Sequence, residues 1–338
     1  MRKFYVPAPY PNLRQIPLLA EPRSDDNRLF QHLPFSEYKN IFEIVSTIYE
    51  SDAVLLPHYL TDLATRVPYL EVVEHIAHKA GKKLIIFTTQ DSPLPITRVN
   101  SIIIRPSAYA SSLRANEIVA PALVEDLGAI HGVVPFTKGE APTIGFVGRA
   151  DFDSFKTRIK YFLRNYVLYT GSHRDGMYFR RAAIRAIQSD TRLSSHIISR
   201  RSFGAHRTTL ELSPEGSRTE YVESIKNSLF VLAPRGDGNY SLRFYEALSL
   251  GRIPILIDTD VMLPFEPELL YDDCIMRIPY SQVGRINEIV WTYWSQKSEL
   301  ELQQSQKKAR EMFESYLYYP RFLRVLFDSQ KFTDLLKI

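Results

Sequence analysis

The sequence predicts an α/β protein made of two doubly wound halves, each a parallel β-sheet covered by helices. Short runs of β-branched and aliphatic residues alternate with longer segments in which apolar residues recur three and four positions apart. The short runs are apolar throughout, which is typical of strands buried on both faces. The chain has 338 residues, enough for two domains, and its 45% hydrophobic and 24% charged residues are those of a globular protein.

In the first half, four short apolar runs are the expected strands, and two segments with helical periodicity are the expected helices. The strands are residues 53–57, 83–89, 101–105 and 118–124, and the helices are residues 36–50 and 67–80. Their alternation predicts consecutive βαβ units.

The pattern begins again after the polar stretch 137–142, so we place a domain boundary near residue 140. Here the expected strands are residues 143–148, 196–200, 229–234, 253–258 and 275–279, and the expected helices lie at about 152–165, 176–189, 219–227 and 242–250. Residues 285–338 are helical in pattern and rich in aromatic residues, and Pro320 is expected to kink or restart a helix. In such folds, ligands bind beyond the carboxyl ends of the strands.

The charge is unevenly distributed. Residues 141–252 carry 18 Lys and Arg side chains against 10 Asp and Glu, whereas the whole chain has 42 against 38. A basic second half is expected to attract an anion such as phosphate, a nucleotide or nucleic acid, although scattered solvated arginines would give the same composition. The single cysteine, Cys274, excludes an intramolecular disulfide and fits a reducing compartment. Neither a signal peptide nor an apolar run long enough to span a membrane is recognised, so the sequence predicts a soluble protein.

The most informative segment is residues 229–265, where a strand, a loop and a helix follow one another. The strand ends at Pro234, the loop covers residues 235–239, and Ser241 can cap a helix that stops at Gly251. Loop amides and the positive end of a helix attract phosphate at such a junction. The segment contains neither the dinucleotide-binding fingerprint nor the P-loop.

Charged side chains at this junction indicate its chemistry. Arg235 and Arg243 would add full charges and planar hydrogen-bond donors for a phosphate. Glu246 follows Arg243 by three residues and shares its helical face, where a carboxylate suits ribose hydroxyls better than phosphate. A surface ion pair between Arg243 and Glu246, with an ordinary turn at Gly236, is the alternative.

These residues resemble the signature of the exostosin family of glycosyltransferases. The matching positions are Pro234-Arg235-Gly236, Ser241-Leu242-Arg243-Phe244-Tyr245-Glu246-Ala247, Gly251-Arg252-Ile253-Pro254, Asp258 and Leu263-Pro264-Phe265. Residues 52–57 and 144–148 resemble the family's first-domain strand and second-domain opening more weakly, and Arg180 or Arg181 resembles the arginine that follows that opening. The family's first-domain pattern rich in Gly, Arg, Asp and His is not recognisable between residues 60 and 90.

The resemblance implies a GT-B fold, in which two Rossmann-like domains face each other across a cleft. It implies an acceptor-side domain at 1–140, a domain at 141–311 that binds the nucleotide sugar, and a final helix at 312–338 that packs back on the first domain. The donor-binding residues that it implies are Arg235, Gly236, Ser241, Arg243, Glu246, Arg180, Arg181 and Arg149.

The activity implied by the resemblance is inverting transfer of a sugar from a nucleotide-sugar donor, a UDP-sugar, in polysaccharide biosynthesis. The acceptor would be a glycan or a lipid-linked glycan, and neither a cofactor nor a metal ion would be required. Eukaryotic members carry a membrane anchor and a luminal stem, which are not recognised here, so we expect a cytoplasmic protein with peripheral membrane contact at most and no nucleic-acid partner.

Inversion requires a base that removes the acceptor hydroxyl proton. Asp91 is the first candidate, because it follows the carboxyl end of the expected strand 83–89, although it could instead be a turn residue before Pro93. His58, just past the strand 53–57, is the second candidate, and its alternative is a hydrogen-bonded structural role.

Other functions stay open at this point. Asp258-Thr259-Asp260 after an apolar strand resembles the metal-binding motif of metal-dependent GT-A glycosyltransferases, although it lies inside the exostosin-like signature. His75 and His78 could ligate a metal but are expected to be exposed. A non-catalytic scaffold related to glycosyltransferases and a nucleic-acid module around Arg200 and Arg201 complete the alternatives.

Overall fold

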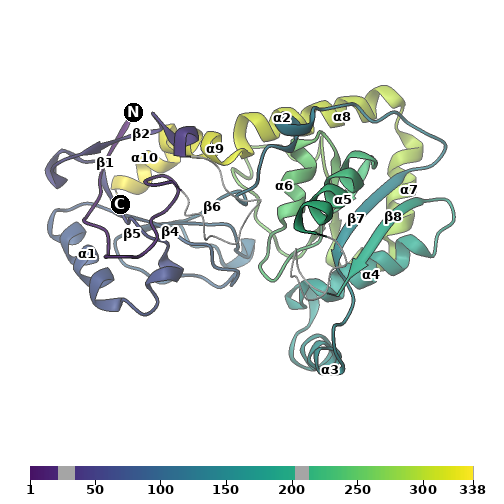
Figure 1. The fold of residues 1–338 in the computed structure, drawn as a ribbon, viewed down its shortest axis with the longest axis horizontal. Coiled ribbons are helices and arrows are strands. Elements are labelled where there is room, and N and C mark those ends of the chain that lie inside the picture. The colour runs from purple at the N-terminus through teal and green to yellow at the C-terminus, as the bar shows by residue number, and fades with distance from the viewer. Residues whose placement is uncertain (22–34, 202–212, 338) are drawn as a thin grey trace. The chain divides into compact units, whose positions relative to one another are not determined.

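A computed structural model describes residues 1–21, 35–201 and 213–337, and in it the chain divides into two compact units, each built on one parallel β-sheet. The first unit is Met1–Glu125 with Met262–Glu266 and Ser315–Ile338, and the second is Asp126–Val261 with Pro267–Glu314. Figure 1 shows helices packed on the sheet of each unit. The prediction of two parallel-sheet α/β halves is confirmed.

The sheet of the first unit has the strand order β2-β1-β3-β4-β5-β6, with every neighbouring pair parallel. The strands are β1 (Arg2–Tyr5), β2 (Phe42–Val45), β3 (Ala53–Leu55), β4 (Leu84–Phe87), β5 (Ser101–Arg105) and β6 (Glu117–Val119), and the helices of this unit are α1 (Val67–Lys79), α9 (Tyr319–Asp328) and α10 (Gln330–Lys337).

Side chains of alternate strand residues cover both faces of this sheet. In β3, Ala53 and Leu55 face the core that contains α9 and α10, whereas Val54 faces the core beneath α1. Strands buried on both faces are apolar at every position, which is why the sequence shows continuous apolar runs. Pro320 lies in the first turn of α9, where a missing N–H costs the helix nothing.

The sheet of the second unit has the strand order β11-β10-β9-β7-β8, again all parallel. The strands are β7 (Thr143–Arg149), β8 (Ser194–Arg200), β9 (Phe230–Leu232), β10 (Ile253–Asp258) and β11 (Met276–Pro279), and the helices are α2 (Leu127–His131), α3 (Phe155–Phe162), α4 (Gly176–Gln188), α5 (Pro214–Lys226), α6 (Leu242–Ser249), α7 (Ile286–Gln296) and α8 (Glu299–Met312). Phe230 and Leu232 pack in the core with α4 and α7, and Val231 packs with α5 and α6.

The expected helix at residues 36–50 is wrong. This segment forms the strand β2, with short 3-10 turns on either side at Phe35–Tyr38 and Ile48–Glu50. Its apolar spacing fits a helix, but β1 offers a free edge, and Phe42, Ile44 and Val45 suit a strand that pairs with it. The strand β1 was not expected from the sequence at all.

The compact units divide between Glu125 and Asp126, whereas the sequence places the boundary near residue 140. Residues 126–140 are held by the second unit. Arg310 Nη2 donates to the Asp126 carboxylate at 3.0 Å, and the amide of Phe136 donates to Gln306 Oε1 at 2.7 Å. Long-range contacts of this kind leave no local signal in the sequence. Among the residues that the structure describes, no helix is long and apolar enough to cross a membrane.

Candidate functional site

The second sheet has its topological switch point between β7 and β9. The chain leaves β7 toward β8 on one side, and β9, β10 and β11 follow on the other side. Ligands of open α/β sheets bind beyond the carboxyl ends of the two strands at such a point. Arg149 is the last residue of β7, and Arg235 lies three residues beyond the end of β9. Two of the predicted donor-binding residues therefore lie at the switch point.

Hydrogen bonds hold the loop between β9 and α6 in place. The amide of Gly236 donates to the carbonyl of Tyr240 at 2.8 Å. Asn239 is buried, and its side chain donates to the carbonyl of Asp260 at 3.0 Å and accepts from Thr259 Oγ1 at 2.6 Å. Ser241 stands at the N-cap of α6, but its side chain makes no capping hydrogen bond to the helix. The strand, the loop and the helix follow one another as the sequence predicts, but hydrogen bonds fix the loop, and Ser241 does not cap the helix through its side chain.

Arg180 ties the two strand ends together. It projects from α4, and its guanidinium donates to the carbonyl of Arg149 and to the carbonyl of Arg235, both at 3.0 Å. Arg180 and Arg235 are each only 6% exposed. Arg243 comes from α6 and donates to the carbonyl of Val147 at 2.6 Å, with its guanidinium 4.4 Å from the centre of the Phe146 ring. Arg180 of α4 and Arg243 of α6 therefore both donate to carbonyls near the carboxyl end of β7, and Arg180 also donates to the loop after β9.

Arg149 and Arg243 each influence Arg180 electrostatically, and the three form an arginine cluster. The acidic groups near Arg180 are Asp175 and Asp237, so positive charge is in excess. Burial, and then the charges of Arg243 and Arg149, lower the pKa of Arg180 to about 10, while Asp237 and Asp175 oppose the shift. At neutral pH the guanidinium remains charged, so the unit keeps a buried cation among other cations. A bound anion would relieve this repulsion, which makes the junction a suitable place for a diphosphate.

Two glycines allow the close packing of the cluster: Gly148, which the sequence places only within the segment 144–148, and Gly176, which the sequence analysis did not single out. A Cβ on Gly148 would lie 2.6 Å from Nη2 of Arg243. A Cβ on Gly176, at the start of α4, would lie 2.3 Å from the carbonyl oxygens of both Arg235 and Gly236. Gly236 itself has no such constraint, because a Cβ added there would lie 3.6 Å from its nearest neighbour, the Tyr240 carbonyl oxygen. The required glycines lie on other elements, so only their three-dimensional contacts reveal them.

Glu246 and Arg181 lie beside the cluster and have other partners. Glu246 is buried, pairs with Arg218 of α5 at 2.7 Å, and accepts a hydrogen bond from the hydroxyl of Tyr221. Arg181 donates to the carbonyl of Ala150 at 2.8 Å. Of the two neighbouring arginines, Arg180 is thus the one that bridges β7 and the loop after β9.

The Asp258-Thr259-Asp260 segment uses its polar groups within the second unit. One Asp258 oxygen accepts from the amide of Val261 at 3.1 Å, and the other lies 3.5 Å from Arg277. Among the described residues, no group of three or more His, Cys, Asp or Glu side chains could hold a metal ion. His75 and His78 are exposed on α1.

In the first unit, His58 holds the backbone. It is fully buried, its Nε2 accepts from the amide of Tyr10 at 2.8 Å, and its Nδ1 donates to the carbonyl of Arg14 at 2.7 Å. Both ring nitrogens are therefore engaged by the main chain, in an arrangement that requires the neutral imidazole. This geometry favours the structural alternative for His58 over the role of base.

Asp91 is exposed and lies four residues beyond the end of β4. The hydroxyl of Ser107, which is buried, donates to the Asp91 carbonyl at 2.7 Å. The main chain of Asp91 is therefore held by the buried Ser107, whereas Asp91 itself is exposed to solvent.

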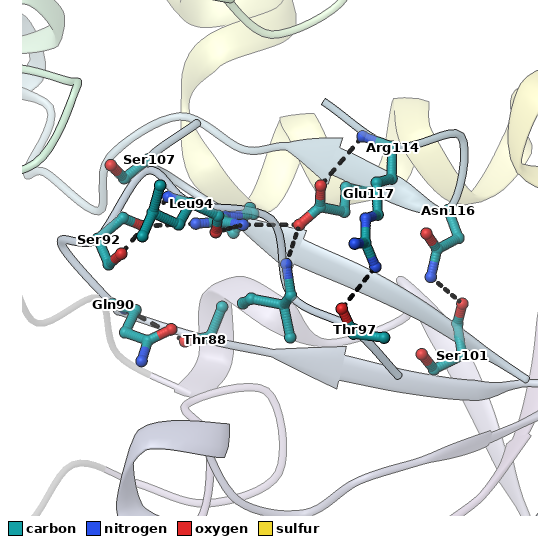
Figure 2. A network of polar contacts seen from close by, with 12 residues as sticks. Thr88, Gln90, Ser92, Leu94, Thr97, Ser101, Ser107, Arg114, Asn116 and Glu117 are labelled. Carbon is teal, nitrogen blue, oxygen red and sulfur yellow. Dashed lines mark hydrogen bonds and ion pairs between the residues drawn. The ribbon is translucent and has the colours of Figure 1, made fainter. Parts of the chain in front are cut away.

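A buried ion pair fixes the segment after Asp91, and the sequence analysis missed it. Arg105 Nη1 lies 2.6 Å from Glu117 Oε1, and both side chains are inaccessible to solvent. The pair holds residues 92–96, and Figure 2 shows Glu117 together with Ser92 and Leu94 of this segment. Arg105 donates to the carbonyls of Ser92 and Leu94, and the amide of Ile96 donates to Glu117 at 3.0 Å. Charged residues at the end of one strand and the start of the next were the only signal in the sequence.

Comparison with known proteins is consistent with the resemblance found in the sequence. Residues 169–292 match the model of the exostosin GT47 domain. The chain is 32% identical to an exostosin-1 homolog of Caenorhabditis elegans over 114 residues, which are 34% of this chain and 28% of that protein. It is 31% identical to a probable beta-1,4-xylosyltransferase, IRX10L, of Arabidopsis thaliana over 72 residues, which are 21% and 17% of the two chains. The chain thus spans less than a third of the length of these relatives.

Solved structures show a more distant likeness. The crystal structure of TarM has a TM-score of 0.44 and 11% identity, over 85% of this chain and 56% of that one. Anabaena HepE, solved with UDP and glucose, has a TM-score of 0.38 and 11% identity, over 86% and 78% of the two chains. Because these TM-scores are low, we assign the fold from the sheet topology described above and not from these structures.

Proposed function

We propose that this protein is a glycosyltransferase that acts in polysaccharide biosynthesis, because residues 169–292 match the model of the exostosin GT47 domain. The observation that carries the proposal is the arginine cluster at the switch point of the second sheet. There Arg180 bridges the carbonyls of Arg149 and Arg235 next to Arg243. The ligand that fits this cluster is the diphosphate of a nucleotide-sugar donor.

Each side chain then has a chemical role. Arg235, Arg243 and Arg180 would supply the positive charge that stabilises the diphosphate, and the amides at the start of α6 with the hydroxyl of Ser241 would complete its contacts. Glu246 is oriented by Arg218 and Tyr221 and accepts hydrogen bonds from ribose hydroxyls. Relatives named glucuronosyltransferase and xylosyltransferase make UDP-glucuronic acid and UDP-xylose the first donors to test.

The reaction we propose inverts the anomeric carbon in one displacement. The acceptor hydroxyl oxygen attacks that carbon, its proton passes to Asp91, and the bond to the diphosphate oxygen breaks. The negative charge that develops on the leaving diphosphate is stabilised by the arginines. The proposal therefore needs no metal ion, and we expect transfer to continue in EDTA.

The first experiment measures thermal unfolding by tryptophan fluorescence, because Trp291 and Trp294 both lie in the second unit. UDP at about one hundred times its Kd should add about 2.7 kcal/mol to the free energy of unfolding. Arg243→Gln should remove this gain, whereas Arg285→Gln, an exposed arginine of the same unit, should keep it. GDP, CMP and dTDP are the comparison nucleotides. If none of the four nucleotides stabilises the wild type, or if the Arg243→Gln variant is still stabilised by UDP, the assignment of the donor site is wrong.

A second measurement separates catalysis from donor binding. Asp91→Asn should abolish sugar transfer and leave the UDP stabilisation intact, because the residue is exposed and belongs to the other unit. Glu71→Gln, an exposed carboxylate on α1, is the matched control. Turnover that survives Asp91→Asn would remove this residue from the mechanism while leaving the donor site untouched.

A further inference from the structure

The segment 155–169 of the second unit is a helix that buries almost nothing. Ser154 caps α3 by accepting from the amide of Thr157 at 3.2 Å, and after Phe162 the helix continues as a π-helical turn, Leu163–Leu168. No residue of α3 is buried, and in the turn only Asn165 is. Figure 1 shows α3 standing away from the sheet of its own unit. An exposed helix of this kind is usually polar.

This helix is instead strongly apolar on its outer face. Phe155 is 76% exposed, Phe162 is 57% exposed and Leu168 is 68% exposed. Ile159, Leu163, Tyr166, Val167 and Tyr169 are also exposed large hydrophobic residues. Phe155, Ile159, Phe162 and Leu163 follow the spacing of one helical face. So many exposed apolar side chains in one segment mark an interaction surface.

Positive charges flank this apolar face. Lys156, Arg158, Lys160 and Arg164 lie in the same segment and are exposed, and the sequence has no acidic residue between Asp153 and Asp175. In helical spacing, Lys156, Lys160 and Arg164 recur every four residues and form a row beside the apolar face. The partner of this surface must therefore be both apolar and negatively charged.

The inner side of the segment is linked to the residues on either side of it, through Asn165 to Asp175 and through Tyr161 to Phe152. Asn165 is fully buried, and its side chain donates to the Tyr161 carbonyl at 2.9 Å and to Asp175 at 2.8 Å. The Asn165 oxygen in turn accepts from the amide of Asp175 at 2.8 Å. The Tyr161 ring packs edge-on against Phe152 with 5.1 Å between the ring centres.

We propose that the segment 155–169 is an interfacial helix that docks the second unit on an anionic lipid membrane. Its apolar side chains would enter the boundary between headgroups and acyl chains, and its lysines and arginines would contact anionic headgroups. The phosphates of a nucleic acid would pair with the lysines and arginines but leave the side chains of Ile159, Leu163 and Val167 exposed to water. A second copy of the chain would cover the apolar face but bring the four cations of each copy close to those of the other. The inference does not rest on the proposed transfer reaction, because docking is measured without turnover.

The test is co-sedimentation of the full chain with vesicles. Wild type should bind equimolar phosphatidylcholine and phosphatidylglycerol, bind pure phosphatidylcholine far more weakly, and be released by high salt. Lys156→Ser with Lys160→Ser should weaken binding to the anionic vesicles about 25-fold, at about fivefold for each cation. Phe155→Ser with Phe162→Ser should weaken it at least about tenfold.

Matched controls come from other exposed residues of the same unit. Leu270→Ser with Leu300→Ser removes two apolar side chains of similar exposure, and Lys307→Ser removes an exposed cation. These variants should bind as wild type does. All variants should keep the wild-type unfolding temperature, because none of the substituted side chains is buried.

Several outcomes would overturn the proposal. One is failure of the wild type to bind anionic vesicles, and another is unchanged binding of the segment variants. Binding of a labelled oligouridine without vesicle binding would assign the surface to nucleic acid. A dimer that dissociates in the Phe155→Ser and Phe162→Ser variant, again without vesicle binding, would assign it to a second copy. Loss of UDP stabilisation concerns only the donor site, so the two proposals fail separately.

Discussion

A single carboxylate, Glu117, neutralises a buried arginine and holds the segment that follows Asp91. Replacing it by glutamine would leave the Arg105 charge buried without its counter-charge. We expect Glu117→Gln to lower the free energy of unfolding of the first unit by about 3–5 kcal/mol, measured by urea denaturation followed by far-ultraviolet circular dichroism. The amide of Ile96, which donates to Glu117, should also lose protection from hydrogen exchange.

An exposed ion pair nearby provides the control. Glu74 lies 3.3 Å from Arg98, and both side chains are partly exposed. Glu74→Gln should therefore cost no more than about 1 kcal/mol. Equal costs for the two substitutions would mean that the Arg105 pair is not the support of residues 92–96.

The side chains that the sequence could predict are those that belong to one local motif. Arg235, Ser241 and Arg243 lie within nine residues, and the strand, loop and helix around them are visible as a pattern. Gly176 and Glu117 escaped prediction because their partners lie on distant segments, and the partners of His58 are main-chain groups of residues 10 and 14. Such contacts can be identified only in the three-dimensional structure, because the sequence does not show which distant segments lie together.

At the scale of elements, the start of α4 packs directly on the loop that follows β9. We expect Gly176→Ala to displace this loop, because the new Cβ would lie 2.3 Å from two carbonyl oxygens of the main chain. Neither oxygen belongs to a flexible side chain, so the backbone itself must move. The variant should lose most of the stabilisation by UDP in the fluorescence assay, and its unfolding temperature should fall.

The matched substitution is Gly236→Ala, within the loop itself. Its Cβ would meet its nearest neighbour at 3.6 Å, an ordinary contact, so UDP stabilisation should be retained. Sequence reasoning ranks these two glycines the other way round, since only Gly236 belongs to the exostosin-like signature. If Gly236→Ala were the more damaging change, the loop would be limited by its own conformation and not by α4.

Elements were predicted well wherever the pattern of one segment decides its structure. The strands β3, β4, β5, β7, β9, β10 and β11 and the helices α1, α4 and α6 lie where the apolar runs and helical spacings place them. The segment with β2 failed because its apolar residues fit either period, and its pairing with β1 decided the outcome. The boundary predicted near residue 140 differs from the division between Glu125 and Asp126 for a similar reason, since tertiary contacts hold residues 126–140.

At the scale of the whole molecule, the two units have separate cores, and the side chains that can report unfolding by fluorescence or thiol labelling lie in only one of them. Both tryptophans and the single cysteine lie in the second unit. Cys274 is fully buried, and burial raises the pKa of its thiol to about 12, so at neutral pH it stays protonated and unreactive. Tryptophan fluorescence and thiol labelling therefore both report the opening of the second unit alone.

The C-terminal residues complete the core of the first unit, although the second unit precedes them in the chain. Phe322, Phe327 and Phe332 are fully buried there against Phe4 and the strands of the first sheet. Removing residues 315–338 should unfold the first unit, because the loss of one buried phenylalanine costs about 3–5 kcal/mol and a whole domain is stable by only about 5–15 kcal/mol. The tryptophan transition, the slow labelling of Cys274 and the UDP stabilisation should all persist in the shortened chain.

A point substitution tests the same dependence without shortening the chain. Phe322→Ala should lower the unfolding transition seen by far-ultraviolet circular dichroism and leave the tryptophan transition in place. Tyr316→Ala, at an exposed position of the same C-terminal segment, should change neither. If Phe322→Ala moved both transitions by the same amount, the two units would unfold as one cooperative body. The second unit would then depend for its stability on the last helices of the chain.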